Sequence, residues 1–233
     1  MNLDIIILSQ KENKKRRERI KSQNLGGRFV DDIRGEDLTE EDMRENMTTE
    51  AYKRYLQYGD ERVRGSLGKN SLALSLTWKM IMENISQPTL VLEDDSAVCS
   101  NFYKKLDIAY RFVPKCKNEK MNWDLLYISW NKFDWHVGPK INECVTAVQK
   151  TLHGSGGLLV HPKCKDIFLS MFPSDYIIDH DIPYKLINTK KIKAYMLTYY
   201  GKRLAITDNF AGSTLSEEGS INWDTFDNWD RRQ

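Results

Sequence analysis

Short apolar runs rich in β-branched residues alternate along this chain with longer stretches of helical periodicity, and this alternation constrains the fold more than any other feature. The apolar runs predict strands at residues 3–8, 28–33, 89–92, 123–129 and 192–198, with weaker candidates at 144–148 and 157–160. The intervening stretches predict helices over residues 14–21, 39–58, 71–87, 101–113, 162–172 and 184–188. Such alternation is typical of α/β folds, in which a mostly parallel sheet is covered on both faces. Ligands of these folds bind beyond the carboxyl ends of the strands, which is where functional residues are expected.

Several helix boundaries carry local signals. Thr39 is followed three residues later by Asp42, which resembles a capping box, and Gly59 is expected to end the helical stretch. Pro162 and Pro183 are each expected in the first turn of a helix, because the fixed φ of proline suits that position.

Length and charge bound the class of protein. With 233 residues, the chain suits one domain, predicted at residues 1–212, followed by a tail at 213–233 that is docked or flexible. A net charge of +2 excludes an overall basic field built for nucleic acid, so no nucleic-acid partner is expected. The apolar run at residues 5–8 is too short for a signal peptide or a membrane span. We therefore predict a soluble, cytoplasmic protein, and its four scattered cysteines are expected to be reduced.

Three acidic residues follow the predicted strand at 89–92 directly. If the strand geometry persists, Glu93 and Asp95 point to one side and Asp94 to the other. Two carboxylates one strand repeat apart can share a hard divalent cation and leave positions for phosphate oxygens. The alternative is an exposed acidic loop that caps a helix beyond Ser96.

Residues 90–95, Leu-Val-Leu-Glu-Asp-Asp, resemble the ilEDDv motif of glycosyltransferase family 25. That family includes bacterial lipopolysaccharide glycosyltransferases and galactosyltransferases acting on collagen hydroxylysine. Other segments resemble the family's motifs in the same order: the opening strand with its R-r-e-r helix at 7–20, f-x-a-v-d-G at 29–35, the helix at 78–84, wDllyL at 123–127, g-x-x-Y-l-i-S at 154–160 and the p-x-D loop at 178–181. The resemblance spans roughly residues 3–200.

One departure from the family pattern lies ahead of the acidic motif. The family carries G-x-x-G-C-x-x-S-H, whereas here Gly65 to Gly68 are followed by Lys69-Asn70-Ser71-Leu72, without the cysteine or the histidine. Whatever that histidine does in relatives, this chain does differently or not at all.

The resemblance implies a GT-A type fold and metal-assisted, inverting transfer of a sugar from a nucleoside diphosphate donor. In relatives the donor is most often UDP-galactose and the metal Mn²⁺, with Mg²⁺ as the other choice here. Glu93 and Asp95 would hold the metal, which neutralises the departing diphosphate as a Lewis acid. Asp94 would orient a ligand or a donor hydroxyl. The acceptor would be a glycan or a glycosylated, hydroxylysine-containing peptide.

The segment Asp179-His180-Asp181 is the candidate for proton transfer, because inversion needs a general base near the acceptor hydroxyl. The resemblance makes Asp179 the first candidate and Asp181 the second, while His180 is a base or a further metal ligand. The alternative is that one of the aspartates caps the helix near Pro183.

Donor contacts are expected where the first strand ends and at a glycine-rich turn. Leu8 and Ser9 end the first strand, and the guanidinium of Arg16 follows them in the chain. Gly156 lies in a turn whose glycines permit close approach of a ligand. The alternatives are that Arg16 lies on the solvated face of a surface helix and that Gly156 belongs to an ordinary tight turn.

Two aromatic segments remain open to more than one interpretation. Trp130, Trp135 and His136 follow a strand, and their side chains either stack on sugars or pack on the protein's own core. The tail beyond residue 212 contains three further aromatic residues among acids: Trp223, Phe226 and Trp229.

Three rival functions are weighed against the transferase. The first is a degenerate transferase that binds the donor without turnover, which the missing Ser-His motif favours. The second is a nucleic-acid-binding protein that uses the basic helix at 14–21, for which near-neutral net charge is unfavourable. The third, a sugar-nucleotide pyrophosphorylase, lacks its glycine-rich N-terminal phosphate loop here.

Overall fold

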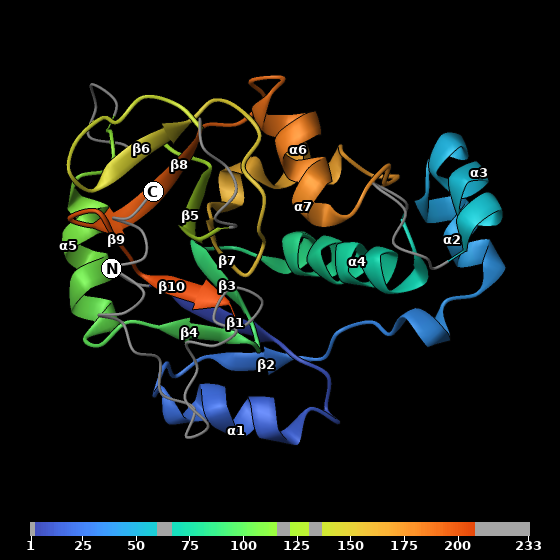
Figure 1. Cartoon of the computed structure of the whole chain (residues 1–233), viewed down its shortest axis with the longest axis horizontal. Helices are drawn as coiled ribbons and strands as arrows, with labels where there is room; N and C mark the ends of the chain where they lie inside the picture. Colours follow the sequence, from blue (N-terminus) through green and yellow to red (C-terminus); the bar gives the residue numbers. More distant parts are fainter. Residues whose placement is uncertain (1–2, 60–66, 116–121, 131–136, 208–233) are drawn as a thin grey trace.

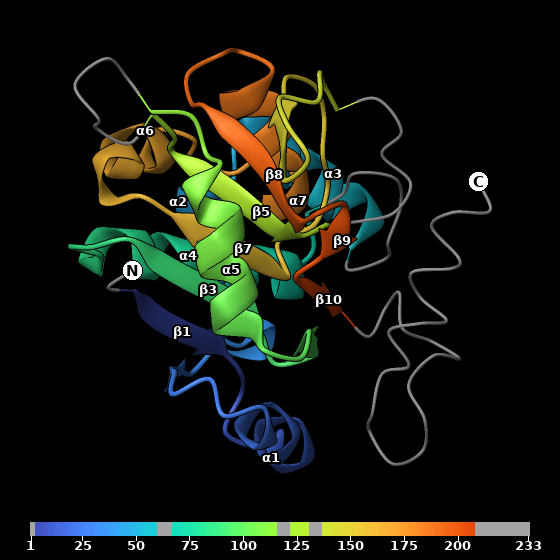
Figure 2. The same ribbon diagram turned by 90° about the vertical axis from the view of Figure 1, so that its left-hand side faces the viewer.

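The computed structural model describes residues 3–59, 67–115, 122–130 and 137–207, which form a sheet flanked by helices (Figures 1 and 2). The strands are β1 (Asp4–Leu8), β2 (Arg28–Val30), β3 (Thr89–Glu93), β4 (Ser96–Val98), β5 (Leu125–Ser129), β6 (Val145–Val148), β7 (Gly157–Val160), β8 (Ala194–Tyr199), β9 (Lys202–Arg203) and β10 (Ala205–Thr207). The α-helices are α1 (Lys14–Ser22), α2 (Glu40–Asn46), α3 (Thr49–Tyr58), α4 (Lys69–Asn84), α5 (Phe102–Arg111), α6 (Lys165–Leu169) and α7 (Ile178–Asp181). Two short 3₁₀ turns, η1 (Gly35–Asp37) and η2 (Pro162–Cys164), and a π-helix, η3 (Ile182–Ile187), complete the set.

Within these ranges, eight strands form the central sheet in the order β2-β1-β3-β7-β5-β8-β6, with β9 paired to β8. Strands β1, β2, β3, β5 and β8 run in one direction, and β7, β6 and β9 in the other. The predicted α/β class with a mostly parallel sheet is therefore confirmed. A separate two-stranded sheet pairs β10 with β4.

Side chains of neighbouring residues alternate between the two faces of the sheet, as the period of two requires. Ile7 of β1 packs on one face with Leu106 of α5, whereas Leu8 packs on the other with Trp78 of α4 and Phe168 of α6. The rings of Trp78 and Phe168 stack with centroids 6.0 Å apart. Figure 2 shows α5 in front of the sheet and α4 behind it. Both faces are thus covered, as predicted.

The ends of the first three strands are level. Leu8 pairs with Val30 of β2 and with Glu93 of β3, so the chain leaves all three strands at the same edge. Strand β7 runs against β3, and its first residue, Gly157, pairs with Leu92. The segment that enters β7 therefore reaches the same edge from the opposite direction.

The helix-boundary signals are borne out at Thr39 and Gly59. Thr39 and Asp42 form both bonds of a capping box at the start of α2. Gly59 ends α3 with a φ of +62°, a left-handed conformation that favours glycine.

Three local predictions are wrong. Residues 178–181 form the helix α7 rather than a loop, and α7 runs directly into η3, in whose first turn Pro183 lies as expected. The helix expected over 162–172 is divided into η2 and α6 and ends at Leu169. The acidic segment is followed by β4 and not by a helix, and Asp94 and Asp95 are buried, which excludes the exposed capping loop.

No helix in the described ranges combines the length and apolar character needed to cross a membrane. Cys99, Cys144 and Cys164 are buried free thiols, as expected. The predicted tail at 213–233, Trp135 and His136 lie outside the described residues.

Candidate functional site

A cleft of about 500 Å³ opens at the edge where β1, β2 and β3 end. Its walls come from the segments that follow these strands and from the first turns of α4, which contribute Asn70 and Leu74. Five of the residues singled out in the sequence line it: Leu8, Arg16, Glu93, Asp94 and Asp95. The cleft therefore lies where the rule for parallel strands in α/β folds predicts a ligand site.

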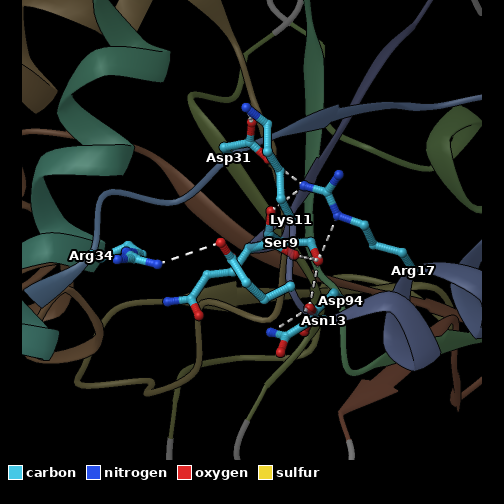
Figure 3. Close-up of polar contacts among 9 residues, drawn as sticks. Ser9, Lys11, Asn13, Arg17, Asp31, Arg34 and Asp94 are labelled. Carbon is cyan, nitrogen blue, oxygen red and sulfur yellow. Dashed lines mark hydrogen bonds and ion pairs between the residues drawn. The ribbon is translucent and has the colours of Figure 1, made fainter.

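Asp94 is the buried centre of a hydrogen-bond network that ties β3 to the start of α1 (Figure 3). Its carboxylate accepts hydrogen bonds from Ser9 Oγ at 2.7 Å and Asn13 Nδ2 at 3.3 Å. Arg16 Nη1 adds an ion pair at 3.1 Å. These donors match a buried carboxylate, so Asp94 holds the β1–α1 connection in place.

A second layer of this network surrounds Ser9. Arg17 Nε donates to Ser9 Oγ at 3.2 Å, and Arg17 also pairs with Asp31, which follows β2. Lys11 Nζ lies 3.0 Å from Asp31, and its hydrogen bond lowers the pKa of Asp31. Desolvation opposes this shift, and the hydrogen bond from Arg17 supports it. Ser9 is fully buried and supports Asp94 rather than lining the cleft. Arginines of α1 are thus engaged with the protein, which does not favour the nucleic-acid interpretation.

Glu93 lies in the opposite electrostatic environment. Burial, followed by the negative charges of Asp179 and Asp95, raises the pKa of Glu93 to about 8. Ser155 Oγ donates to Glu93 Oε1 at 2.7 Å and lowers this pKa only in part. The fold therefore gathers carboxyl groups from β3 and α7 that repel one another.

Acidic side chains outnumber basic ones around the cleft. Among the described residues, Arg16 and Arg34 face the lining acids Glu12, Asp32, Glu36, Glu93, Asp94 and Asp95. Arg34 is itself paired with Glu36 at 2.5 Å and with Asp37 at 3.2 Å. An anionic ligand in this cleft would need a cation beside it.

The donor set fits a cation that is shared with a ligand. Carboxylate oxygens such as those of Glu93 and Asp95 suit Mn²⁺ and Mg²⁺, and Mg²⁺ is usually held by one or two carboxylates together with substrate phosphates. In the part of the chain that the structure describes, no three His, Cys, Asp or Glu side chains are grouped to hold a metal. Glu93 and Asp95 are the carboxylates in the cleft that would hold such a cation.

Asp32, at the end of β2, was not predicted as a site residue although it lines the cleft. Burial, then the charge of Asp94, raises the pKa of Asp32 to about 7, and Arg17 opposes the shift. Its buried Oδ1 has no hydrogen-bond partner among the described residues. The signal was available, because Asp32 follows a strand that runs parallel to β1 and ends level with it.

The three residues of the predicted catalytic segment take different positions on α7. The Asp179 carboxyl lies near Glu93, as its effect on the Glu93 pKa indicates, and its carbonyl accepts a hydrogen bond from His153 Nδ1 at 3.1 Å. The ring of His180 lies 4.3 Å from that of His153, and burial lowers the pKa of His180.

Asp181 faces the protein interior rather than Glu93. Its Oδ2 accepts a hydrogen bond from the backbone N–H of Asp175 at 3.1 Å, and Lys185 Nζ lies 3.5 Å from its Oδ1. Burial raises the pKa of Asp181 to about 6, and Lys185 opposes the shift. Asp181 makes no side-chain cap bond to η3, which follows it, so the capping alternative is not borne out at this residue. Its contacts tie α7 to the preceding segment and to Lys185 instead.

Gly156 braces the end of β3 through its backbone. Its carbonyl accepts hydrogen bonds from Glu93 N at 3.3 Å and from Ser96 Oγ at 2.6 Å. It does not line the cleft. The ring of Trp130 is covered by the Arg203 guanidinium at 4.6 Å, so this residue packs on the protein's own structure.

The fold and the cleft define an α/β protein that receives its ligand at the carboxyl ends of parallel strands. The model of glycosyltransferase family 25 (LPS biosynthesis protein) matches residues 2–153, more than half of the chain. The chain therefore belongs to glycosyltransferase family 25 and is a glycosyltransferase. The matched range includes the cleft, whereas α7 lies beyond it. The sheet and its flanking helices agree with the GT-A type fold that the resemblance implies.

Among solved structures, the chain is similar to the crystal structure of a glycosyltransferase involved in the glycosylation of the major capsid of PBCV-1. The similarity has a TM-score of 0.43 and 9% sequence identity, and covers 89% of this chain and 94% of the other. It is too weak to carry over a donor, an acceptor or a mechanism. No curated protein matches the sequence.

Proposed function

We propose that this glycosyltransferase is metal-dependent and inverting, and that it moves a hexose, with galactose expected, from a UDP-sugar to a hydroxyl of a glycan or glycosylated peptide. One observation carries the proposal: Asp95 and Asp179 lie near enough to Glu93 to raise its pKa, so carboxyl groups from β3 and α7 meet beside the cleft. Proteins rarely gather such groups without a cation or a chemical use for them. A cytoplasmic location remains part of this proposal.

Donor binding follows from the charges of the cleft. A Mn²⁺ or Mg²⁺ ion bound by Glu93 and Asp95 would act as a Lewis acid that neutralises the departing diphosphate. The Arg16 side chain is about half exposed beside the cleft, and its guanidinium suits a phosphate oxygen. Asp94 holds Arg16 in that position. Asp32 lines the cleft, and its buried Oδ1 has no hydrogen-bond partner among the described residues. We expect it to form a hydrogen bond with the nucleoside.

Asp179 is the proposed general base. In an inverting transfer, the acceptor oxygen forms a bond to the anomeric carbon while the bond from that carbon to the diphosphate oxygen breaks. The electron pair of the broken bond goes to the diphosphate, and the proton of the acceptor hydroxyl goes to the Asp179 carboxylate. Asp181, buried and bound to Asp175 and Lys185, would keep α7 in place.

The test is a thermal-shift panel of UDP-, GDP- and CMP-sugars with and without Mn²⁺. We expect UDP-galactose with Mn²⁺ to give the largest rise in melting temperature, because a ligand that binds the folded state stabilises it. We also expect slow hydrolysis of UDP-galactose in the presence of Mn²⁺, measured as release of galactose. Equal shifts for all nucleotides, unaffected by Mn²⁺, would refute the proposed donor and metal.

The second candidate is a binding protein on the same scaffold that has lost turnover. The observation in its favour is that α4 presents Asn70 and Leu74 to the cleft, in a segment where relatives carry Ser-His. A UDP-sugar that binds with Mn²⁺ but is neither hydrolysed nor transferred would support it.

A further inference from the structure

Four side chains form a second cluster beside the site, on the side of α7. Tyr176, His180 and Tyr184 are spaced four residues apart in sequence: Tyr176 precedes α7, His180 lies in α7 and Tyr184 in η3. His153 reaches them from the segment before β7. Ring centroids of His180 lie 4.3 Å from His153 and 5.7 Å from Tyr184, and those of Tyr176 and Tyr184 lie 5.6 Å apart. The edge-to-face geometry of the two tyrosines is typical of a well-ordered aromatic cluster.

This cluster, Tyr176–His180–Tyr184–His153, is joined to the site at two points. His153 Nδ1 donates to the carbonyl of Asp179, and two residues further along the chain Ser155 Oγ donates to Glu93. None of its four rings lines the cleft that receives the proposed donor. The cluster therefore adjoins the backbone of Asp179, and the segment that carries His153 also contacts Glu93, which lines the cleft.

The cluster presents both apolar and polar groups. Tyr184 is 40% exposed, and Tyr176 and both histidines are partly exposed. Because the Asp179 backbone carbonyl can only accept, His153 donates to it from Nδ1. Ring faces suit the C–H face of a pyranose, and imidazole and phenol groups suit its hydroxyls.

We propose that Tyr176, His180, Tyr184 and His153 form the acceptor subsite, and that it binds a hexopyranoside whose hydroxyl is directed at Asp179. The inference rests on the proposed function, because only a transferase needs an acceptor opposite its donor. Beyond the proposed function, it states where the acceptor binds and that the acceptor is a hexopyranoside. The Arg54 guanidinium covers one face of Tyr176 at 5.2 Å, whereas Tyr184 is exposed and offers its ring to a ligand.

Binding of simple sugars tests the subsite independently of turnover. The probes are the methyl α- and β-glycosides of glucose and galactose, measured by saturation-transfer NMR on the full chain with UDP and Mn²⁺. We expect at least one glycoside to receive saturation from the wild-type protein. Tyr184→Ala should weaken its binding about tenfold, whereas Tyr184→Phe, which keeps the ring, should stay within about twofold. Tyr200→Ala, at another exposed tyrosine, is the matched control and should have no effect.

The outcomes separate this inference from the proposed function. Absence of saturation transfer for every glycoside, or unchanged binding in Tyr184→Ala, overturns the acceptor subsite. Failure of the proposed function instead appears as missing Mn²⁺-dependent stabilisation by UDP-sugars in the wild-type protein. Melting temperatures of the three variants provide the folding check, and little change is expected because both tyrosines are exposed.

Discussion

Glu93 and Asp94 are adjacent in sequence, yet they lie in opposite environments at the end of β3. Asp94 is surrounded by donors from the β1–α1 connection, including Ser9, Asn13 and Arg16. Glu93 has one donor, Ser155, and is otherwise surrounded by acids that raise its pKa. Glu93 is the last residue of β3 and meets Ser155, whereas Asp94 lies in the turn between β3 and β4 and meets the β1–α1 connection. One carboxyl group therefore serves the scaffold, whereas its neighbour is left for a ligand.

The largest expected effect is the loss of metal-dependent UDP binding when the proposed metal site at the end of β3 is altered. Asp95→Asn should abolish Mn²⁺-dependent binding of UDP, because it removes one of the two proposed metal ligands. Isothermal titration calorimetry with UDP, with and without Mn²⁺, measures it. Asp166→Asn, on the exposed surface of α6, is the control. Unchanged affinity in Asp95→Asn contradicts the metal site.

Asp179→Asn separates donor binding from chemistry on the acidic side. Turnover should fall by a factor of about 10² or more, as expected when a general base is lost. The thermal shift with UDP and Mn²⁺ should stay within error of the wild type. Turnover is followed as release of UDP. Undiminished turnover would remove Asp179 from the role of base.

Asp94→Asn tests the scaffold side of the comparison. It should lower the free energy of unfolding by about 1–3 kcal/mol, because hydrogen bonds to a buried charge are lost. Glu93→Gln should leave stability near the wild-type value in metal-free buffer at pH 7, since Glu93 is largely protonated there. Urea denaturation of both variants measures the difference. Equal losses would mean that the two environments do not differ in energy.

The smallest effect concerns pH. The pKa of Glu93 is about 8 in the folded protein and close to its ordinary value in the unfolded chain, so the folded state binds the extra proton between these values. Metal-free stability should therefore fall as pH rises from about 5 to 8, by less than about 1.4 kcal/mol per pH unit from this group. Urea titrations in EDTA measure the slope. Glu93→Gln should reduce it, and a steeper slope in that variant would contradict the assignment.

Much of the fold could be predicted, because its signals are local. The apolar run of β1, the helical spacing around Trp78 and the capping box at Thr39 each depend on a few neighbouring residues. The helix α7 was missed because a single turn has too few residues to establish a period. The position of β7 between β3 and β5 depends on pairings between distant segments, which alternation of strands and helices does not specify.

The candidate site divides in the same way. Glu93, Asp94 and Asp95 could be found because they follow a clear strand, and their common location in the cleft follows from parallel pairing. Their different environments could not, because the donors around Asp94 come from residues about 80 positions away. The tyrosines of the acceptor cluster gave no signal either, since their proximity depends on the turn that precedes α7 and on the course of α7 and η3.

The antiparallel course of β7 has a consequence for how such an enzyme can diversify. The proposed donor site is built on one stretch of chain, from β1 to β3, and the proposed acceptor surface on two later ones, residues 153–156 and 176–184. Each part can accumulate changes while the other keeps its own contacts. Grafting residues 174–188 from a relative is thus expected to redirect the recipient sugar without disturbing nucleotide choice.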